Sequence, residues 1–397
     1  MPINTAKQNL LNLKNQNLLR ERRIIGSASS IYADVDGKKM LSFASNDYLG
    51  LASSPILAEA AAQAAFTWGV GTGSSHMITG HMQIHEKLET KLADFVGAER
   101  ALLFSTGYMA NLGVITALIG REDAAFSDRL NHASLIDAVI LSRAGNVRYR
   151  HVDIEHLATL LKKSRAKTKL IITDAVFSMD GVLAPLPELL DLAKKYDAWL
   201  LIDDAHGFGV MGENGRGTHA HFGLGLHPRI IYVGTLGKAA GVSGAFAAGQ
   251  KDVIELIMQR ARSYIYTTAP SPIIAATLIK SIELIEAGSH LRSQLFSLIE
   301  RLRSGLSHTE LSPLPSPGPI QPIIVGENTK TLEISLKLAQ KNILVPAIRP
   351  PTVPKGSARL RISLSAVHNT GHIDLLIEAL KALRSTTPEG QGLLARI

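Results

Sequence analysis

A lysine in a glycine-rich run is the residue of this sequence best suited to covalent chemistry. Lys238 lies in residues 234–244, after a predicted strand, where glycines let the backbone turn tightly beside a bound group. The neighbouring Gly and Ala residues partly desolvate the amine, which favours its neutral, nucleophilic form. Taken alone, Lys238 is more simply interpreted as a solvated loop lysine, so its role depends on the residues that accompany it.

Asp203 accompanies it at a second predicted strand end. It closes the apolar run 199–202, where burying a carboxylate is costly unless it meets a cation or a strong donor. A protonated pyridine nitrogen is such a partner, and a carboxylate that keeps it protonated lets the ring accept electrons from a carbanion. Alone, Asp203 is typical of a loop cap. Together with Lys238 and His206, it predicts pyridoxal phosphate (PLP) held as a Schiff base on Lys238.

The phosphate and the ring of such a cofactor need further partners. Residues 105–111 run from a predicted strand into a predicted helix, and they offer hydroxyls and the backbone N–H groups of a helix N-terminus. Thr235 is a second hydroxyl candidate. His132 is placed to lay its imidazole on a flat ring, although a lone loop histidine is more often structural. These assignments therefore depend on the pair Lys238 and Asp203.

A glycine pattern favours a competing function. Residues 207–212 match the dinucleotide-binding fingerprint and follow a predicted strand, which is typical of a nicotinamide oxidoreductase. The context is wrong, because the glycines come after Asp-Asp-Ala-His, residues 213–217 are not expected to be helical, and no acidic residue lies between Glu213 and Asp252. Gly237 and Lys238 resemble the end of a nucleotide phosphate loop, but the upstream Gly and the Ser/Thr are missing. The oxidoreductase stays the alternative outside the PLP class.

Histidine spacing raises the question of a metal site. His81 and His85 are four residues apart, but Met82 stands where the zinc-protease pattern needs Glu. A second, loose group consists of His219, His221 and His227. We predict no metal site and expect each of these histidines to be partly exposed.

The elements that position these residues are indicated by hydrophobic periodicity. Helices are expected from about 54 to 66 and from about 84 to 96, and buried strands at 101–104, 170–173, 199–202 and 230–233. This alternation predicts an α/β fold with a mostly parallel sheet covered by helices on both faces. Ligands bind beyond the carboxyl ends of such strands, so the polar residues that follow them are expected at one edge.

The character of the sequence changes after about residue 284. Amphipathic helices follow, together with the Pro-rich stretch 311–322, which is interpreted as a boundary or an irregular connection. We therefore divide the chain into an N-terminal helix with a small-domain segment (1–45), a large cofactor-binding domain (46–283) and a smaller α/β C-terminal domain (284–397).

Composition limits the class of protein. With 397 residues, of which 46% are hydrophobic and 19% charged, the chain is typical of a globular protein with a large core. The absence of Cys excludes disulfides, thiolate zinc sites and iron–sulfur clusters. The net charge of +8 is scattered, which suits a small polyanion such as coenzyme A better than nucleic acid. No signal peptide or membrane segment is recognised, so a cytoplasmic location is expected.

Five motifs, at 45–51, 131–134, 176–181, 203–207 and 237–244, resemble the α-oxoamine synthases, a family of fold-type-I PLP enzymes. The resemblance extends from about Arg20 to the last helix. It implies an aspartate-aminotransferase-like large domain with a mostly parallel seven-stranded sheet, plus a smaller C-terminal domain.

Residues 347–354 are similar to the branch of the family that condenses L-alanine with pimeloyl-CoA or a pimeloyl carrier-protein thioester. That reaction gives 8-amino-7-oxononanoate, CO₂ and CoA, in biotin biosynthesis. A glycine C-acetyltransferase is the alternative within the class, because nothing in the composition fixes the acyl chain.

The resemblance also implies roles for individual residues, with Lys238, His132 and Asp203 at the reacting centre and Lys238 as the base that removes the Cα proton. His206 and Ser178 would contact the ring hydroxyl, and His132 would stack on the ring. The remaining residues implied at the cofactor are Gly107, Tyr108, Thr235 and, from the partner subunit of a homodimer, Thr267 or Thr268; those implied at the substrate are Arg20, Asn46, His132, Arg349 and Thr352.

Arg349 is the natural clamp for an amino-acid carboxylate, since a guanidinium binds it bidentately. Two departures from the family pattern stand near the site: Asp174 where relatives commonly have Glu, and Ala239-Ala240 in place of a Gly-Phe pair. Both leave the proposed chemistry intact but could change the packing around Lys238.

Overall fold

The computed structural model describes residues 2–16, 18–20 and 22–383. The chain forms two compact units, one of residues 46–293 and one in which residues up to Ser45 join those from Gln294 onward. The boundary between the two units after Ser293 lies inside helix α12 (Ser289–Leu306). The functional division at 1–45, 46–283 and 284–397 stays a prediction.

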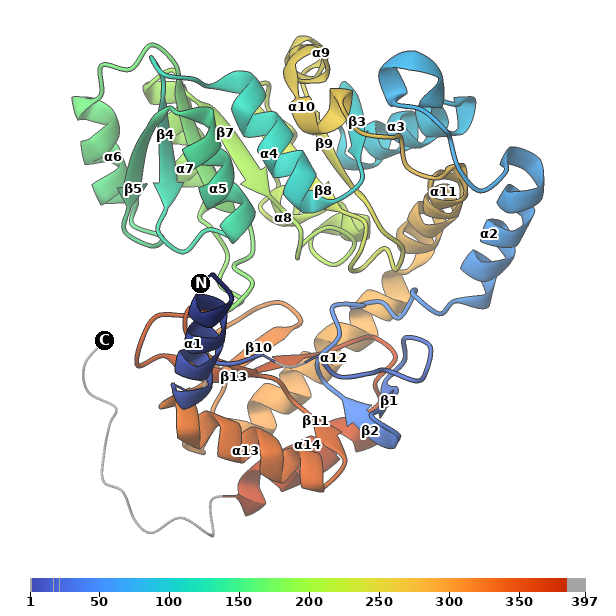
Figure 1. Ribbon diagram of the computed structural model, residues 1–397, viewed down its shortest axis with the longest axis vertical. Helices are drawn as coiled ribbons and strands as arrows, with labels where there is room; N and C mark the ends of the chain where they lie inside the picture. Colours follow the sequence, from blue (N-terminus) through green and yellow to red (C-terminus); the bar gives the residue numbers. More distant parts are fainter. Residues whose placement is uncertain (1, 17, 21, 384–397) are drawn as a thin grey trace. The chain divides into compact units, whose positions relative to one another are not determined.

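The larger unit is built on one seven-stranded sheet with the order β3-β9-β8-β7-β6-β4-β5 (Figure 1). Neighbouring strands are parallel except at β9, which is antiparallel to both of its neighbours. The mostly parallel sheet predicted from the sequence is therefore confirmed. The strands are β3 (Arg100–Phe104), β4 (Ala124–Asp128), β5 (Gly145–Tyr149), β6 (Lys169–Asp174), β7 (Trp199–Asp203), β8 (Ile230–Thr235) and β9 (Ala245–Gly249).

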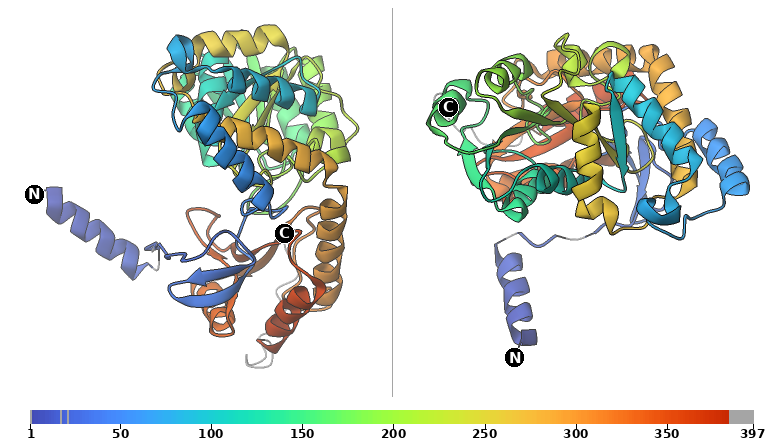
Figure 2. Two further views of the ribbon diagram at one scale, coloured as in Figure 1. Left: turned by 90° about the vertical axis from the view of Figure 1, so that its right-hand side faces the viewer. Right: turned by 90° about the horizontal axis from the view of Figure 1, so that it is seen from above.

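Helices lie on both sides of this sheet, as the view from above shows (Figure 2, right). Apolar residues of α4, α5 and α9 pack with residues of the central strands in one buried cluster. The helices of this unit are α2 (Pro55–Trp68), α3 (Gln83–Val96), α4 (Gly107–Leu118), α5 (Ala133–Ser142), α6 (Ile154–Lys163), α7 (Leu186–Lys195), α8 (Thr218–His221), α9 (Lys251–Arg260), α10 (Arg262–Ile265) and α11 (Pro272–Ala287), with a π-helical turn η1 (His76–Gly80) and a 3₁₀ turn η2 (Glu213–Gly215).

Local sequence explains where the two predicted helices begin and end. Pro55 occupies the first turn of α2, where its missing N–H is not needed. Gly97 ends α3 in the left-handed conformation with φ of 73°, which glycine adopts without strain. Both predicted helices are thereby confirmed to within two residues of their expected ends.

The smaller unit holds two three-stranded sheets, β1-β2-β11 and β10-β13-β12. The Pro-rich stretch 311–322 was expected to be irregular, but its last three residues begin β10. Because β10 is an edge strand that pairs with β13, the missing N–H of Pro322 costs no ladder bond. The elements are α1 (Pro2–Asn15), β1 (Tyr32–Val35), β2 (Lys38–Ser42), β10 (Ile320–Gly326), α13 (Asn328–Gln340), β11 (Ile343–Leu344), β12 (Ala347–Ile348), β13 (Ala358–Ser363) and α14 (Thr370–Ala382).

None of the helices in the part of the chain that the structure describes has the length and apolar character needed to cross a membrane.

Candidate active site

The carboxyl ends of β3, β7 and β8 meet at one edge of the large sheet. A Cβ added to Gly107, just after β3, would lie 3.8 Å from Oγ1 of Thr235 at the end of β8. Asn111, one turn further along α4, donates from Nδ2 to Oδ2 of Asp203 at the end of β7, over 2.6 Å. The polar residues that follow the strands are thus gathered as the parallel arrangement predicts.

Asp203 is a buried carboxylate held by neutral donors. Besides the amide of Asn111, the backbone N–H of Ala205 donates to its Oδ1 over 3.0 Å, and 6% of the residue is exposed. Asn111 also donates to Ser134 Oγ over 2.9 Å, so its amide group is fixed. A carboxylate fixed in this way would gain from a cationic partner at the edge of the sheet. The contact of Asn111 with Asp203 was not predicted from the sequence, although Asn111 lies in the 105–111 segment.

Lys238 contacts His206, as expected for residues of one site. Lys238 Nζ lies 2.9 Å from His206 Nε2, in the half-buried turn that follows β8. On the other side of the imidazole, Nδ1 lies 2.6 Å from the hydroxyl of Tyr48, a fully buried residue. Tyr48 in turn donates to Asn46 Oδ1 over 3.1 Å. Tyr48 was not predicted as a site residue, although it lies in the recognised motif at 45–51.

His132 precedes α5 and is fixed through its backbone and its side chain. Its backbone N–H donates to Asp174 Oδ2 over 2.7 Å, and its Nδ1 lies 2.8 Å from Ser134 Oγ. Burial lowers the pKa of the His132 imidazole, with opposing contributions from the charges of Asp203 and Lys238. Since both charges act on His132, these groups share one electrostatic neighbourhood, and burial favours the neutral imidazole.

Asp174, at the end of β6, is the departure from the family pattern noted in the sequence. It is buried, and burial followed by the nearby charge of Asp203 raises its pKa well above the ordinary value. Its backbone N–H donates to Asn131 Oδ1 over 3.1 Å, while its side chain accepts from His132. Asp174 therefore connects β6 to the segment that carries the histidine.

The predicted phosphate partners surround the start of α4. Thr106 caps this helix by accepting from the backbone N–H of Met109 over 3.1 Å, and Gly107 and Tyr108 are the first helical residues. A helix N-terminus beside the hydroxyl of Thr235 has the donors that an anion requires. Ser178 lies half-buried in the turn after β6, next to the bridge between Val176 and Leu183.

The predicted substrate residues are divided between the two units. In the smaller unit, Arg20 Nη2 donates to Thr352 Oγ1 over 3.1 Å, and the backbone N–H of Thr352 donates to the carbonyl of Arg349 over 3.1 Å. Arg20 is therefore a neighbour of Thr352, although the two are 332 residues apart in the sequence. Asn46 is the first residue of the larger unit.

Thr267 and Thr268 lie in the segment that follows α10. Thr268 forms an isolated bridge with Ser75, and Thr72 Oγ1 donates to the carbonyl of Ala269 over 2.9 Å. Thr267 is half-buried and Thr268 is exposed. The segment is thus attached to residues 72–75, and its predicted contact with a second subunit stays a prediction.

The dinucleotide alternative lacks its structural context. Residues 213–215 form a 3₁₀ turn in which Asn214 has φ of 55°, which corrects the expectation that they are not helical, but no α-helix begins there. A Cβ added to Gly207 would overlap the side chains of Asp204 and Thr218, and one on Gly209 would lie 2.8 Å from Cβ of Ala239. These glycines allow close packing within the protein instead of an approach to a pyrophosphate.

The histidine expectation was wrong for His85 and His219, which are buried. His85 Nε2 lies 2.9 Å from the carbonyl of Pro270 and its Nδ1 accepts from the backbone N–H of Met82, while His219 Nε2 lies 3.1 Å from the carbonyl of Val96. Backbone partners satisfy both ring nitrogens of His85, which offsets the cost of its burial. Within the described part of the chain, Nδ1 of His219 is buried without a hydrogen-bond partner.

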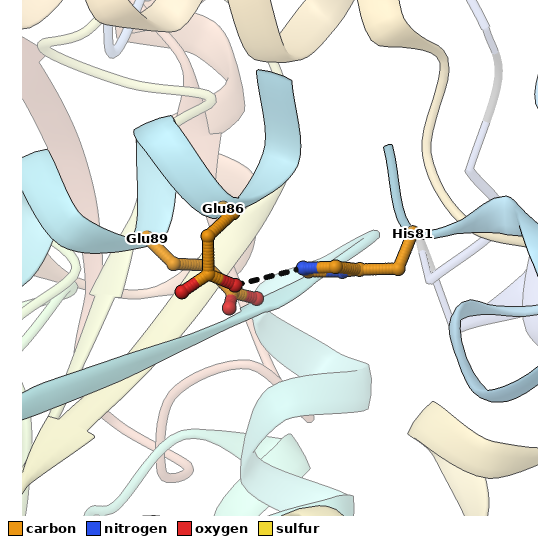
Figure 3. A group of neighbouring side chains, drawn as sticks. All are labelled: His81, Glu86 and Glu89. Carbon is orange, nitrogen blue, oxygen red and sulfur yellow. Dashed lines mark hydrogen bonds and ion pairs between the residues drawn. The ribbon is translucent and has the colours of Figure 1, made fainter. Parts of the chain in front are cut away.

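Among the described residues, one group has the composition of a metal site. Potential ligand atoms of His81, Glu86 and Glu89 lie within 4.8 Å of one another (Figure 3). Hydrogen bonds account for these side chains: His81 Nε2 lies 3.1 Å from Glu86 Oε2 and its Nδ1 2.8 Å from His76 Nδ1, and Glu89 accepts from the backbone N–H of Leu103 over 2.8 Å. His85, four residues from His81 in the sequence, is not in this group, and both of its ring nitrogens have backbone partners.

Comparison with known proteins agrees with this geometry. The model of the family "Aminotransferase class I and II" matches residues 38–380. The 8-amino-7-oxononanoate synthase of Herminiimonas arsenicoxydans is 59% identical over 382 residues, covering 95% of this chain and 98% of that protein. The corresponding protein of Azoarcus sp. (strain BH72) is 54% identical, covering 96% and 97%.

Among solved structures, a serine palmitoyltransferase variant from S. paucimobilis with a bound PLP–myriocin aldimine superposes with a TM-score of 0.89, at 29% identity, and 95% of this chain and 96% of that chain are covered. The fold, the lysine and carboxylate at one sheet edge and these similarities agree. The chain belongs to the class I and II aminotransferase family of PLP enzymes and, within it, to the 8-amino-7-oxononanoate synthases.

Proposed function

We propose that this enzyme condenses L-alanine with a pimeloyl thioester, of coenzyme A or of a carrier protein, to give 8-amino-7-oxononanoate and CO₂ in biotin biosynthesis. The observation that carries the proposal is the near full-length match, at 59% identity, to a relative with that name. The arrangement of Lys238, His206 and Asp203 supports it, because a carbanion reaction of an amino acid requires both an amine and a buried carboxylate.

The residues at the sheet edge fit PLP. An amine, a buried carboxylate and a helix N-terminus with a nearby threonine hydroxyl correspond to the aldehyde, the ring nitrogen and the phosphate of this cofactor. We assign these roles to Lys238, to Asp203 and to Thr235 with the backbone of Gly107 and Tyr108. When bound, PLP supplies an electron sink for the carbanion at the substrate Cα.

The protein's own groups then manage protons and orientation. We assign to the Lys238 amine the removal of the Cα proton of L-alanine, with His206 Nε2 at 2.9 Å as its hydrogen-bond partner. Asp203 holds a proton at the ring nitrogen, and Ser178 and His206 orient the ring hydroxyl. His132, kept neutral by burial, lies against the ring without adding charge.

The substrate carboxylate is assigned to Arg349, whose guanidinium can bind it through two hydrogen bonds. Arg20 and Thr352, which are hydrogen-bonded to each other, are assigned to the acyl substrate. Asn46 is also assigned to substrate binding. A thioester with several phosphates is attracted by the net charge of +8.

We further propose a cytoplasmic homodimer in which Thr267 or Thr268 reaches the phosphate bound by the partner subunit. Several large apolar side chains of the larger unit are exposed: Phe66 by 94%, Ile78 by 76% and Tyr266 by 71%. Soluble proteins commonly cover such surfaces by association. Light scattering at dilute concentration tests the dimer, and mixing Lys238→Ala subunits with Thr268→Ala subunits tests the shared site by restoration of activity.

The decisive experiment compares visible absorption and product formation. The wild-type protein with PLP is expected to show the visible band of a cofactor attached to lysine, and Lys238→Ala to lack it. Product from L-alanine, glycine and L-serine with pimeloyl, acetyl and palmitoyl thioesters then identifies the substrates. A preference for glycine with acetyl-CoA favours the C-acetyltransferase. Tight nicotinamide binding without a visible band overturns the proposal.

A further inference from the structure

The buried phenol of Tyr48 is linked to the reacting lysine through one imidazole. The Tyr48 hydroxyl lies 3.1 Å from Asn46 Oδ1 and 2.6 Å from His206 Nδ1, and His206 Nε2 lies 2.9 Å from Lys238 Nζ. All four residues belong to the larger unit. Tyr48 is fully buried and 5% of His206 is exposed, so the hydrogen bond between them is shielded from bulk water, while the two outer hydrogen bonds are half-buried. They form a continuous row that ends at the amine.

The donors in this row can be assigned from chemistry. A tyrosine hydroxyl has a single proton, and here it is donated to the amide oxygen of Asn46, so the phenol oxygen is left to accept from the N–H at Nδ1 of His206. A neutral imidazole with its proton on Nδ1 has no proton on Nε2, so Nε2 accepts from an N–H of the Lys238 amine. The imidazole is therefore the neutral tautomer that carries its proton on Nδ1. Every hydrogen in the row points away from the lysine.

We propose that Tyr48 is a positioning residue that sets the tautomer and the ring orientation of His206, and thereby governs how readily the Lys238 amine gives up and regains a proton. Tyr48 contacts no reacting atom in this scheme and acts through the imidazole, whose two nitrogens have different roles once the hydrogen bond of one is fixed. The inference deepens the proposed function and rests on it, because that function requires the amine to exchange protons with the substrate.

The test uses the PLP-loaded enzyme with Tyr48→Phe, which removes the hydroxyl and keeps the packed ring. The visible absorption is titrated from about pH 5 to about pH 9, the range in which histidine-linked proton equilibria fall. We expect its midpoint to move by about one pH unit and kcat to fall about tenfold, as loss of one buried hydrogen bond predicts. KM for L-alanine should change less than about twofold, since uniform substrate binding is untouched.

Tyr264→Phe is the matched control. Tyr264 is also a buried tyrosine of the larger unit, but its ring packs on His76 and Phe104, away from His206. This variant should leave the spectral midpoint and kcat as in the wild type. A midpoint that moves equally in both variants would show that any lost buried phenol disturbs the fold, and the assignment of Tyr48 would be wrong.

A double-mutant comparison tests whether Tyr48 acts through His206. In a His206→Asn background, adding Tyr48→Phe should change neither the midpoint nor kcat further, because residues that act as one unit are not additive. Additive effects would overturn the inference. If Tyr48→Phe does not fold, Asn46→Ala carries the test: it frees the Tyr48 proton for Nδ1, so the midpoint should move in the same direction, and an unmoved midpoint overturns the inference.

The spectral titration separates this inference from the proposed function. It needs no substrate, so it remains valid if the acyl chain or the amino acid has been assigned wrongly. A wild-type enzyme without a visible band contradicts the proposed function itself. A normal wild-type band with an unchanged midpoint in Tyr48→Phe contradicts the role of Tyr48 alone.

Discussion

Two regions of the larger unit collect buried histidines and carboxylates, and they differ in what these groups contact. At the sheet edge, the side chains of Asp203, His206 and Lys238 come from two strand ends and contact side chains of other elements. Around the start of α3, Glu89 and His85 contact backbone groups of Leu103 and Pro270. The first set is directed toward the edge where ligands bind, whereas the second connects elements of the fold.

The pKa shifts of the two regions do not separate them. Burial raises the pKa of Glu89 to about 8 and lowers that of His76 to about 3, just as burial raises the pKa of Asp174 and lowers that of His132 at the sheet edge. Perturbed titration is therefore a poor guide to a site unless the perturbed groups also converge on an open place in the fold.

The largest effect is expected for Asp203→Asn. The amide keeps the size of the side chain but does not hold a proton on the ring nitrogen, so kcat should fall by about 10²- to 10³-fold, the cost of losing one charged partner of the transition state. Steady-state kinetics with L-alanine measures it. Glu86→Gln, in the α3 cluster, is the control and should change kcat less than about twofold. A comparable loss in both variants would erase the distinction between the regions.

Arg349→Lys should mainly weaken binding of the amino acid. Lysine keeps the charge but not the paired donors of guanidinium, so KM for L-alanine is expected to rise about tenfold or more. The binding constant of L-alanine, followed through the change in visible absorption, checks this value. An unchanged constant would remove Arg349 from the site.

Glu89→Gln should alter stability and leave activity intact. The folded pKa of about 8 lies above the ordinary 4.5, so the folded state binds the proton more tightly and wild-type stability falls as the pH rises from about 4.5 to about 8. Gln keeps an acceptor for the backbone N–H of Leu103 and has no charge to bury. Denaturant unfolding at pH 9 should show the variant more stable, by on the order of a few kcal/mol, with little difference at pH 5. Equal pH dependence in both proteins would contradict burial of a titrating Glu89.

The smallest effect is expected from zinc. If His81, Glu86 and Glu89 serve only as a hydrogen-bonded cluster, added Zn²⁺ should not raise the melting temperature, and His81→Gln should cost less than about 1 kcal/mol, as for a partly exposed ion pair. A rise in melting temperature that disappears in His81→Gln would show that the cluster is a metal site after all.

Much of the fold could be predicted because its signals are local. Apolar runs gave four strands of the large sheet, and Pro55 and Gly97 marked ends of two helices. The antiparallel direction of β9 could not be predicted from the sequence, because it depends on the pairing of β9 with β3 and β8 in the folded sheet. The Pro-rich stretch 311–322 was predicted to be irregular throughout, but its last residues begin strand β10, because a proline is tolerated in an edge strand.

The candidate site residues that directly follow strands could be predicted from the sequence. The residues from other elements that contact them could not. Lys238 and Asp203 follow apolar runs, so their meeting at one edge follows from a parallel sheet. Asn111 contacts Asp203 and Tyr48 contacts His206 across long separations in the sequence, and neither residue type indicates chemistry by itself. His85 and His219 were wrongly predicted to be partly exposed. Each ring has a hydrogen bond to a backbone carbonyl that is distant in the sequence, and such a partner cannot be recognised from the sequence.

The approach of Gly209 to Ala239 has a consequence for how this enzyme can change. A Cβ added to residue 209 would lie 2.8 Å from Cβ of Ala239. Ala239 is the residue that directly follows Lys238. Residue 209 therefore has no room for a side chain while residue 239 carries one, and its φ of 80° would strain any residue other than glycine there. Reducing residue 239 to glycine removes only the first of these obstacles, so the neighbour of the lysine is expected to vary only while residue 209 stays glycine.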